Sequence, residues 1–242
     1  MSKIAVLLVA LLALALTAAA QNPVVVELFT SEGCSSCPPA DAILVDLSHQ
    51  SLQNGSLLIL MGEHVDYWNY IGWTDRFSAK QFSERQGDYA RALHGSVYTP
   101  QMVIDGRVQF VGNDASDVAH KLKAAAADPK PAQVALSWDN NKELKVKVSY
   151  ADLAHANVLL AVTEDNLTTA VGAGENNGTT LRHAAVVRQL RNLGTVKSSQ
   201  YDTSINVPPQ PGWNTANLKV AVLVQDPQSK KILGAAAIPY VQ

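Results

Sequence analysis

The sequence predicts an α/β domain, built on a central mixed sheet flanked by helices, followed by a small antiparallel β-sandwich. Strand-like apolar runs alternate with helical spacing as far as residue 127, and a turn-rich stretch follows at Asp128-Pro129-Lys130-Pro131. Beyond it lie short strand-like runs separated by turn residues, with no convincing helix. We therefore expect two domains in the mature chain, at residues 21–128 and 129–242.

Residues 1–20 are typical of a secretory signal peptide. Met1-Ser2-Lys3 supplies a short positive start, Ile4 to Leu16 is an unbroken apolar run, and small residues then lead to Ala20. A bilayer-spanning helix needs about 20 apolar residues, so the short run favours a cleaved signal over an uncleaved anchor. We expect a mature chain that begins near Gln21, is periplasmic or secreted, and has no stable membrane insertion.

The composition is that of a globular protein and leaves its two cysteines as the main chemical feature. Hydrophobic residues make up 47% of the chain and charged residues 17%, which argues against a highly charged disordered chain. A net charge of −2 gives no electrostatic reason to expect nucleic acid or an anionic membrane as a partner. No histidine-rich or cysteine-rich tract for metal is present in the sequence. In an oxidising compartment, a disulfide between the two cysteines can persist.

In the first half, the cysteines lie between a predicted strand and a predicted helix. Residues 24–29 are almost wholly apolar and rich in β-branched side chains, which is typical of a buried strand. Pro38 and Pro39 fit the first turn of a helix, where the N–H groups have no partner, and apolar residues recur at helical spacing up to Leu47. Asn54-Gly55 ends this helix, and residues 56–61 form a second buried strand.

A further helix and a hairpin are expected after the second strand. Residues 75–93 show a helical pattern of aromatic side chains among polar ones. Residues 101–104 and 108–111 are predicted to be short strands, and Asp105-Gly106 between them is a strong hairpin turn signal.

An alanine-rich helix closes the first half, and the pattern then changes to strands. Asp114 or Ser116 is expected to cap this helix, which extends to about Ala127. The strand-like runs of the second half are residues 134–138, 144–148, 158–162 and 218–224. Their turn-separated spacing predicts the β-sandwich.

Cys34 and Cys37 form a Cys-x-x-Cys motif at the predicted strand-to-helix turn. At a helix N-terminus the backbone N–H groups and the dipole favour a thiolate, so Cys34 is expected to be the attacking nucleophile. Cys37 would then resolve the mixed disulfide. Three other interpretations stay open: a structural disulfide, which would close only a very short loop; a zinc site, which lacks a third cysteine; and a copper(I) site formed by two thiols and a histidine.

The order of strand, Cys-x-x-Cys and helix, with Thr99-Pro100 before a hairpin and a final helix, resembles the thioredoxin superfamily. This resemblance implies that Pro100 is cis and packs against the cysteines, and that the Thr99 backbone pairs with an extended substrate chain. Thioredoxins also carry an acidic residue beneath the second cysteine, where it assists proton transfer. Glu27 is the candidate here, with a raised pKa if it is buried. Its spacing to Cys34 is one residue longer than in thioredoxin, and an end-of-strand Glu reaching solvent is the alternative.

The segment from Glu63 to Asp75 is denser in aromatic side chains than any other part of the chain. It leaves the carboxyl end of the second strand, where open α/β sheets place their ligands. We therefore expect Trp68 and Trp73 to wall the cysteine site and to bind substrate, with a packed corner between the domains as the alternative. His64 is expected to be a hydrogen-bonded structural group, with a metal-ligand or proton-relay role as the alternative.

Several motifs spread over nearly the whole mature chain resemble those of a secreted bacterial family catalogued as domain of unknown function 1223. They are residues 26–41 around the cysteines, His64-Val65-Asp66-Tyr67-Trp68, Tyr98-Thr99-Pro100, Gly174-Glu175-Asn176, Leu181-Arg182-His183 and Val186-Val187-Arg188. The resemblance implies the thioredoxin-like fold and an exported location, and it supplies no activity. Arg182, His183 and Arg188 are expected to anchor the sandwich to the first domain, with anion binding as the alternative.

The leading functional hypothesis is an exported thiol–disulfide oxidoreductase that acts on protein or peptide thiols. It has no cofactor and depends on a redox partner that recycles its disulfide. The candidate catalytic residues are Cys34, Cys37 and Glu27, and the candidate substrate-binding residues are Thr99, Pro100, Trp68 and Trp73. One alternative is a copper-binding module or metallochaperone that uses the two cysteines and His64, and another is a non-catalytic thioredoxin-like binding protein. The direction of electron flow depends on thiolate stability, which the motif alone does not give.

Overall fold

The structure is a computed structural model that describes residues 22–52, 55–150 and 155–241. The predicted signal peptide, residues 1–20, lies outside the described residues, and so does Asn54 of the predicted turn. Within the described ranges, no helix combines the length and the hydrophobicity needed to cross a bilayer.

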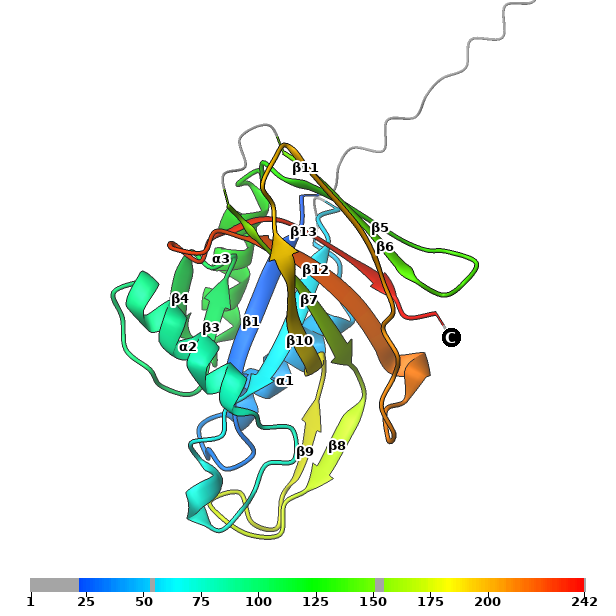
Figure 1. Ribbon diagram of the computed structural model, residues 1–242. Helices are drawn as coiled ribbons and strands as arrows, with labels where there is room; N and C mark the ends of the chain where they lie inside the picture. Colours follow the sequence, from blue (N-terminus) through cyan, green and yellow to red (C-terminus); the bar gives the residue numbers. More distant parts are fainter. Residues whose placement is uncertain (1–21, 53–54, 151–154, 242) are drawn as a thin grey trace, which may run out of the picture.

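Eight strands form one mixed sheet, in the order β13-β12-β7-β10-β2-β1-β3-β4 (Figure 1). The first half contributes β1 (Val24–Thr30), β2 (Leu58–His64), β3 (Gln101–Ile104) and β4 (Val108–Val111). β1 pairs with β2 in parallel and with β3 in antiparallel orientation, and β3 and β4 form the predicted hairpin. All four strands lie within a few residues of the bounds that their sequence patterns predict.

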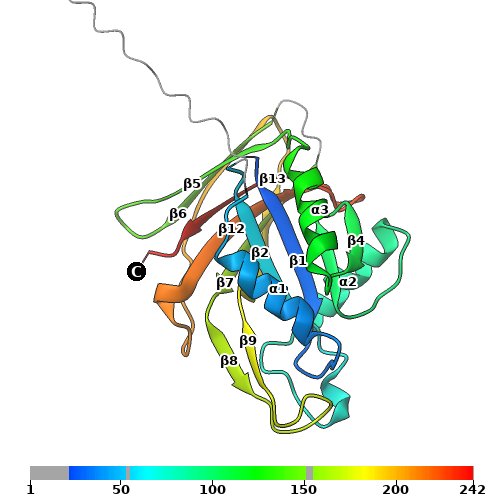
Figure 2. The ribbon, with the colours of Figure 1, turned by 180° about the vertical axis from the view of Figure 1, so that it is seen from behind.

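Three helices cover this part of the sheet: α1 (Pro38–Ser48), α2 (Lys80–Ala92) and α3 (Ala115–Ala126). Successive side chains of a strand point to opposite faces, so β1 has two different apolar faces. Val26 and Leu28 pack in one cluster with residues of α1 and α3, whereas Val25 packs in another with Phe82 of α2. Helices α1 and α3 therefore cover one face of the sheet (Figure 2), and α2 covers the other.

Side-chain hydrogen bonds decide where two of these helices begin. The helix predicted at residues 75–93 starts only at Lys80, because the Asp75 carboxylate accepts the N–H of Phe77 and holds a turn there instead. Asp114, one of the two predicted caps of α3, accepts the backbone N–H groups of Ser116 and Asp117.

The second half extends the same sheet with β7 (Asn157–Glu164), β10 (Val186–Thr195), β12 (Leu218–Gln225) and β13 (Ile232–Pro239). β10 joins β2 in parallel, where Val186 pairs with Gly62. The stretch expected to be a linker is packed, since the buried Lys130 ammonium lies 2.8 Å from the carboxylate of Asp105. The two predicted domains therefore share one sheet, and a boundary at residue 128 stays a prediction.

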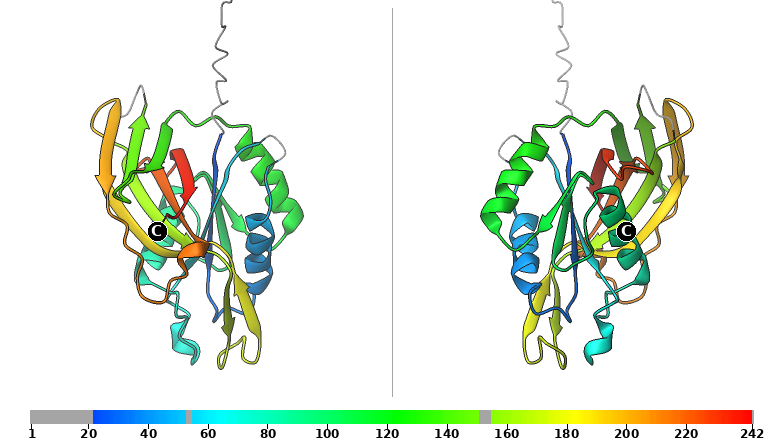
Figure 3. Two further views of the ribbon diagram at one scale, coloured as in Figure 1. Left: turned by 90° about the vertical axis from the view of Figure 1, so that its right-hand side faces the viewer. Right: turned by 90° about the vertical axis from the view of Figure 1, so that its left-hand side faces the viewer.

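A second layer packs against the strands of the second half. It consists of β5 (Gln133–Trp138), β6 (Leu144–Ser149) and β11 (Gln200–Ile205), paired antiparallel in the order β11-β6-β5. Val146 of β6 shares an apolar cluster with Leu160 of β7 and Val222 of β12. Figure 3 shows this layer at one side of the molecule and α1 and α3 at the other. The strand-only second half is thus two-layered as predicted, but one of its layers belongs to the main sheet.

The two remaining strands, β8 (Leu167–Ala170) and β9 (Thr180–His183), form a separate antiparallel hairpin. The hairpin lies at the end of the sheet where the loops after β1 and β2 emerge, and β9 packs against α1 (Figure 1). The short 3₁₀ helices η1 (Asn69–Ile71) and η2 (Thr215–Asn217) complete the described elements. Through this hairpin, the second half of the chain reaches the two cysteines.

Candidate functional site

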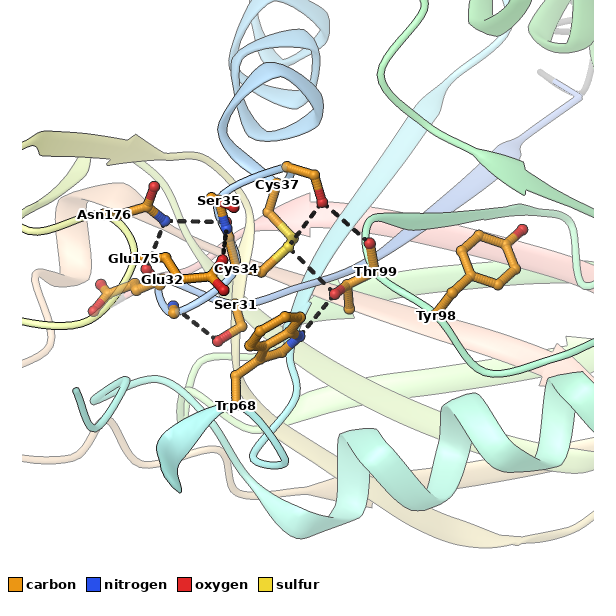
Figure 4. The surroundings of a disulfide bond; sticks show 12 residues. Ser31, Glu32, Cys34, Ser35, Cys37, Trp68, Tyr98, Thr99, Glu175 and Asn176 are labelled. Carbon is orange, nitrogen blue, oxygen red and sulfur yellow. Dashed lines mark hydrogen bonds between the residues drawn. A yellow bond between two sulfur atoms is a disulfide. The ribbon is translucent and has the colours of Figure 1, made fainter. Parts of the chain in front are cut away.

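A disulfide joins Cys34 and Cys37 in the loop between β1 and α1, with 5.4 Å between their Cα atoms (Figure 4). Cys37 is the N-cap residue of α1, and Pro38 and Pro39 occupy its first positions, as the sequence predicts. The side chains of both cysteines are completely buried. The motif therefore has the predicted place in the fold, with its sulfurs covered.

Two hydroxyl groups converge on the sulfur of Cys34. The Thr99 hydroxyl donates to Cys34 Sγ at 3.3 Å, and it accepts the indole N–H of Trp68 at 2.8 Å. Since an indole N–H can only donate, it occupies the acceptor side of the Thr99 hydroxyl and leaves that hydroxyl's hydrogen for the sulfur. The second hydroxyl, that of Ser36, lies 3.3 Å from the same sulfur.

Thr99 and Pro100 contribute from the loop before β3. The bond between them is cis, as the resemblance to thioredoxins implies. The carbonyl oxygen of Thr99 lies 3.4 Å from the Ser36 hydroxyl, whose single hydrogen serves this oxygen or the Cys34 sulfur. The structure thus brings together three of the predicted substrate-binding residues, Trp68, Thr99 and Pro100, beside the cysteines.

The loop between β8 and β9 holds the cysteine loop from the other side. The side-chain amide of Asn176 donates to the carbonyl oxygens of Glu32 at 2.8 Å and of Cys34 at 3.0 Å. The carboxylate of Glu175 accepts the backbone N–H of Ser35 at 3.0 Å. Figure 4 shows Glu175 and Asn176 on one side of this loop and Trp68 and Thr99 on the other.

Sequence reasoning gave Glu175 and Asn176 no role, although it singled out their motif. About 140 residues separate them from the cysteines along the chain. An Asn or a Glu in a turn-rich stretch is ordinary, so no local pattern marks these two. Only the resemblance of both segments to motifs of one family connects the two places.

Trp73 lies beneath this loop and does not reach the Cys34 sulfur through any hydrogen bond described. Its indole N–H donates to the carboxylate of Glu32 at 2.8 Å, and its Cβ lies close to Gly174 of the hairpin. Trp73 therefore packs in the corner between the two halves, which was the alternative to a substrate-binding role. That role stays untested.

His64 and Asp75 form a buried pair on the α1 side of the sheet, with 2.7 Å between His64 Nδ1 and the Asp75 carboxylate. Burial opposes the charged imidazole, but the carboxylates of Asp75, Asp41 and Glu32 outweigh it and raise the pKa of His64. Burial likewise opposes ionisation of Asp75, but His64 and two backbone N–H groups hold its pKa below the ordinary range. The structural interpretation of His64 is the one that this geometry favours.

Two more buried carboxylates and a second histidine adjoin this pair. The Glu32 carboxylate lies 3.4 Å from the His183 ring, and the His183 ring stacks edge-on to that of His64 at 4.9 Å between centroids. Burial raises the pKa of Asp41, one turn after Cys37, although both histidines oppose that rise. His183 of the second half thereby links the hairpin to His64 of β2 and to Glu32 of the cysteine loop, and anchoring of the sandwich by Arg182, His183 and Arg188 stays a prediction.

Glu27 lies on the other face of the sheet, away from α1. Its carboxylate receives the Arg85 guanidinium at 2.6 Å and the hydroxyl of Tyr89, both from α2. Glu63, its neighbour on β2, shares Arg85 at 3.4 Å. Glu27 is completely buried, so the alternative that it reaches solvent is wrong. The partners of its carboxylate are Arg85 and Tyr89 and neither cysteine, and its predicted role in proton transfer stays a prediction.

The described residues contain no group of three or more histidine, cysteine, aspartate or glutamate side chains placed to hold a metal ion. Cys34, Cys37 and His64 are therefore not assembled as a copper site within residues 22–52, 55–150 and 155–241. His64 bonds to Asp75 instead.

The fold and the site define a mixed α/β protein with a Cys-x-x-Cys disulfide at a strand-to-helix turn, clasped by a hairpin from the second half. The chain belongs to the family of proteins of unknown function DUF1223, whose profile matches residues 25–225. The family predicted from the motifs is thus confirmed.

Two solved structures are similar to this chain to different degrees. A crystal structure of a protein from Agrobacterium tumefaciens is 29% identical, with a TM-score of 0.70, and the match covers 90% of this chain and 95% of that one. A domain of the outer membrane lipoprotein Omp28 from Porphyromonas gingivalis is 15% identical over 44% of this chain and 91% of its own, and its TM-score of 0.26 is too low to bear on fold or function. No curated protein matches the chain.

Proposed function

We propose that this protein is an exported thiol–disulfide oxidoreductase with a thioredoxin-like first half, acting on protein or peptide thiols through Cys34. The observation that carries the proposal is the hydrogen-bond chain from the Trp68 indole through the Thr99 hydroxyl to Cys34 Sγ. A disulfide sulfur is a weak acceptor, whereas a thiolate is a strong one. These donors therefore contribute most when the disulfide is open and Cys34 carries a negative charge.

The proposed reaction transfers two electrons from a pair of thiols to a disulfide. In the oxidising direction, a substrate thiolate attacks Cys34 Sγ, the Cys34–Cys37 bond breaks, and the Cys37 sulfur leaves with the electron pair and takes up a proton. A second substrate thiolate then attacks the substrate sulfur of the mixed disulfide and releases Cys34 as a thiolate. The reducing direction is the reverse, and each direction needs a thiol or disulfide partner that resets the pair.

Access to Cys34 is part of this proposal because the sulfur is completely buried. Trp68 is only half-buried and lies at the start of η1, next to the exposed side chains of Tyr67 and Tyr70. A substrate chain that displaces the Trp68 indole would uncover the sulfur and meet these two aromatic rings. The exported location rests on the signal-like sequence of residues 1–20.

The test is a trapping experiment with Cys37→Ser, which keeps the attacking thiol and removes the resolving one. We expect Cys37→Ser to accumulate mixed disulfides with exported proteins, seen as reductant-sensitive adducts on a gel. Cys34→Ser is the matched control and should trap few or none, because it lacks the sulfur that Thr99 and Ser36 contact. Equal or absent trapping by the two variants would contradict the proposal.

A second candidate is a non-catalytic binding protein, and the complete burial of both sulfurs favours it. Its disulfide would then only hold the loop between β1 and α1. In that case the wild-type disulfide resists reduction by millimolar glutathione while the folded state persists. A pair that titrates reversibly with glutathione would exclude this candidate.

A further inference from the structure

The carboxylate of Glu175 is an exposed negative charge bonded to the cysteine loop. It accepts the backbone N–H of Ser35, the residue directly after Cys34, at 3.0 Å. Hydrogen bonds from Ser35 lower the pKa of Glu175, so this carboxylate is ionised at neutral pH. The loop thus holds a fixed negative charge one residue from the sulfur that the proposed function makes the nucleophile.

Several backbone positions near Cys34 offer no free N–H group to a thiolate. Helix N-termini stabilise thiolates with free N–H groups, but Pro38 and Pro39 have none to offer. The N–H of Cys34 itself donates to the Ser31 carbonyl, and that of Cys37 donates to the Cys34 carbonyl. The N–H of Ser35, the residue directly after Cys34, donates to Glu175 and is therefore not available to a thiolate either.

We propose that Glu175 opposes formation of the Cys34 thiolate, so that the hairpin of the second half shifts the Cys34–Cys37 pair towards the disulfide. The proposal rests on the proposed function only in treating Cys34 as a redox-active thiol. Glu175 acts by its charge and through the Ser35 backbone, as a positioning residue, and does not touch the sulfur. The proposal bears on the direction of electron flow, which the motif left open. A less stable thiolate makes the disulfide a weaker oxidant and the dithiol a stronger reductant.

Asn176, the residue after Glu175, bonds the β8–β9 loop to the cysteine loop. Its buried amide donates to the carbonyl oxygens of Glu32 and Cys34, which holds the backbone on both sides of Glu175 and Ser35 close together. The other charged or titratable groups below the loop are the buried Glu32, Asp41, His64, Asp75 and His183, which bond or pair among themselves. Glu175 stands apart from that cluster and faces solvent.

The quantity that reports this effect is the equilibrium between the protein disulfide and reduced glutathione. Two glutathione thiols are oxidised to glutathione disulfide and the Cys34–Cys37 bond breaks. The two protons that the glutathione thiols lose pass to a cysteine sulfur below its pKa and to solvent above it. Any group that destabilises the Cys34 thiolate moves this equilibrium towards the protein disulfide when the pH exceeds the thiol pKa. The same group raises the pKa of Cys34, which thiolate absorbance measures directly.

The test is Glu175→Gln in the full chain, since glutamine still accepts the N–H of Ser35 but carries no charge. We expect the pKa of Cys34 to fall and the equilibrium constant for reduction by glutathione to rise about 3- to 10-fold, which corresponds to about half to one pKa unit. Because Glu175 is exposed, the difference between variant and wild type should shrink in 1 M salt. A change in packing alone would not show that salt dependence.

Glu84→Gln is the matched control, because it removes an equal charge from the exposed face of α2, where Glu84 pairs with Lys80. It should leave both readouts unchanged. An unshifted Cys34 pKa and an unshifted equilibrium in Glu175→Gln would overturn the inference even if Cys37→Ser traps substrates. Conversely, a shifted equilibrium without any trapped substrate would leave the inference intact and remove the proposed function.

Discussion

Buried carboxylates lie on both faces of the sheet, and each face neutralises them differently. On the α2 face, Arg85 bridges Glu27 and Glu63, and burial together with the charge of Glu27 raises the pKa of Glu63 well above its ordinary range. On the α1 face, His64 pairs with Asp75. An arginine stays charged at any relevant pH, whereas a histidine does not, so the His64–Asp75 pair on the α1 face is expected to respond to pH near neutrality.

His64 is expected to make the stability of the fold pH-dependent above pH 6.5. Its pKa in the folded state is raised from 6.5, so its contribution is complete below that pH and is lost as the pH rises through the folded-state pKa. The pKa of Asp75 is lowered from 3.8, so that contribution is lost only in acid, below pH 3.8. Urea unfolding should therefore show a free energy that falls as the pH rises above 6.5, by at most about 1.4 kcal/mol per pH unit for this one proton.

The comparison that isolates this effect is His64→Gln against His120→Gln. His64→Gln should lose stability at pH 6 and show a flatter profile above it, because the titrating partner of Asp75 is gone. His120 is exposed on α3, so His120→Gln should keep the wild-type profile. Parallel profiles for all three proteins would show that the His64 pair does not carry the pH dependence.

The position of Glu27 shows what a one-residue difference in spacing does. Side chains alternate along a strand, so an acid one residue further from Cys34 than in thioredoxins points to the opposite face. That face belongs to α2, and the acid meets Arg85 instead of the cysteines. Asp41, one turn after Cys37, is one of the acids that do lie on the α1 side. The apolar strand around an acidic residue predicts that the residue is buried. Its position along the strand decides which face of the sheet it points to, and therefore which side chain it bonds to.

At the scale of elements, the β8–β9 hairpin depends on close approach to the aromatic segment. Gly174 has a φ of +75°, and a Cβ added there would lie 3.2 Å from the Cβ of Trp73. Gly178, at the other end of the same loop, has a φ of +79° and nothing within 4 Å of an added Cβ. The two glycines thus share their backbone conformation and differ only in what surrounds them.

Gly174→Ala is expected to loosen the clasp on the cysteine loop, and Gly178→Ala is its matched control. Both pay about 1–2 kcal/mol for an alanine with positive φ. Gly174→Ala additionally pushes against Trp73, so it should destabilise the fold more and speed amide exchange at Ser35, whose N–H the neighbouring Glu175 holds. Equal unfolding free energies and equal exchange at Ser35 in the two variants would contradict a tight contact at residue 174.

Elements with a strong local signal were predictable, and those fixed by distant contacts were not. β1, α1 and the β3–β4 hairpin follow from apolar runs, the two prolines and Asp105-Gly106. The predicted start of α2 was wrong because the Asp75 side chain accepts the backbone N–H of Phe77 and forms a turn in place of the first helical turn. Helical spacing of apolar residues does not reveal such a hydrogen bond. The clasp of Glu175 and Asn176 on the cysteine loop arises from the tertiary fold alone.

At the scale of the molecule, the strand pattern of the second half was predictable but its attachment was not. Short alternating runs predict antiparallel strands without saying which sheet they join. Here β10 pairs with β2, and residues of both halves form one apolar cluster with α2. Within that cluster, Ile59, Met61 and Phe82 of the first half pack with Ala161 and Leu223 of the second. The two halves therefore bury each other's apolar surface.

This shared cluster predicts that residues 22–128 do not form an independent soluble domain. Alone, that fragment would expose the edge of β2 and the apolar side chains of Ile59, Met61 and Phe82, both of which favour aggregation. We expect the fragment to aggregate or to bind a hydrophobic dye strongly, as measured by size-exclusion chromatography and dye fluorescence. Co-expression with residues 129–242 as a second chain should restore a soluble one-to-one complex, because the same surfaces then meet. A monodisperse 22–128 fragment that unfolds cooperatively would instead support the domain boundary predicted from the turn-rich stretch at residue 128.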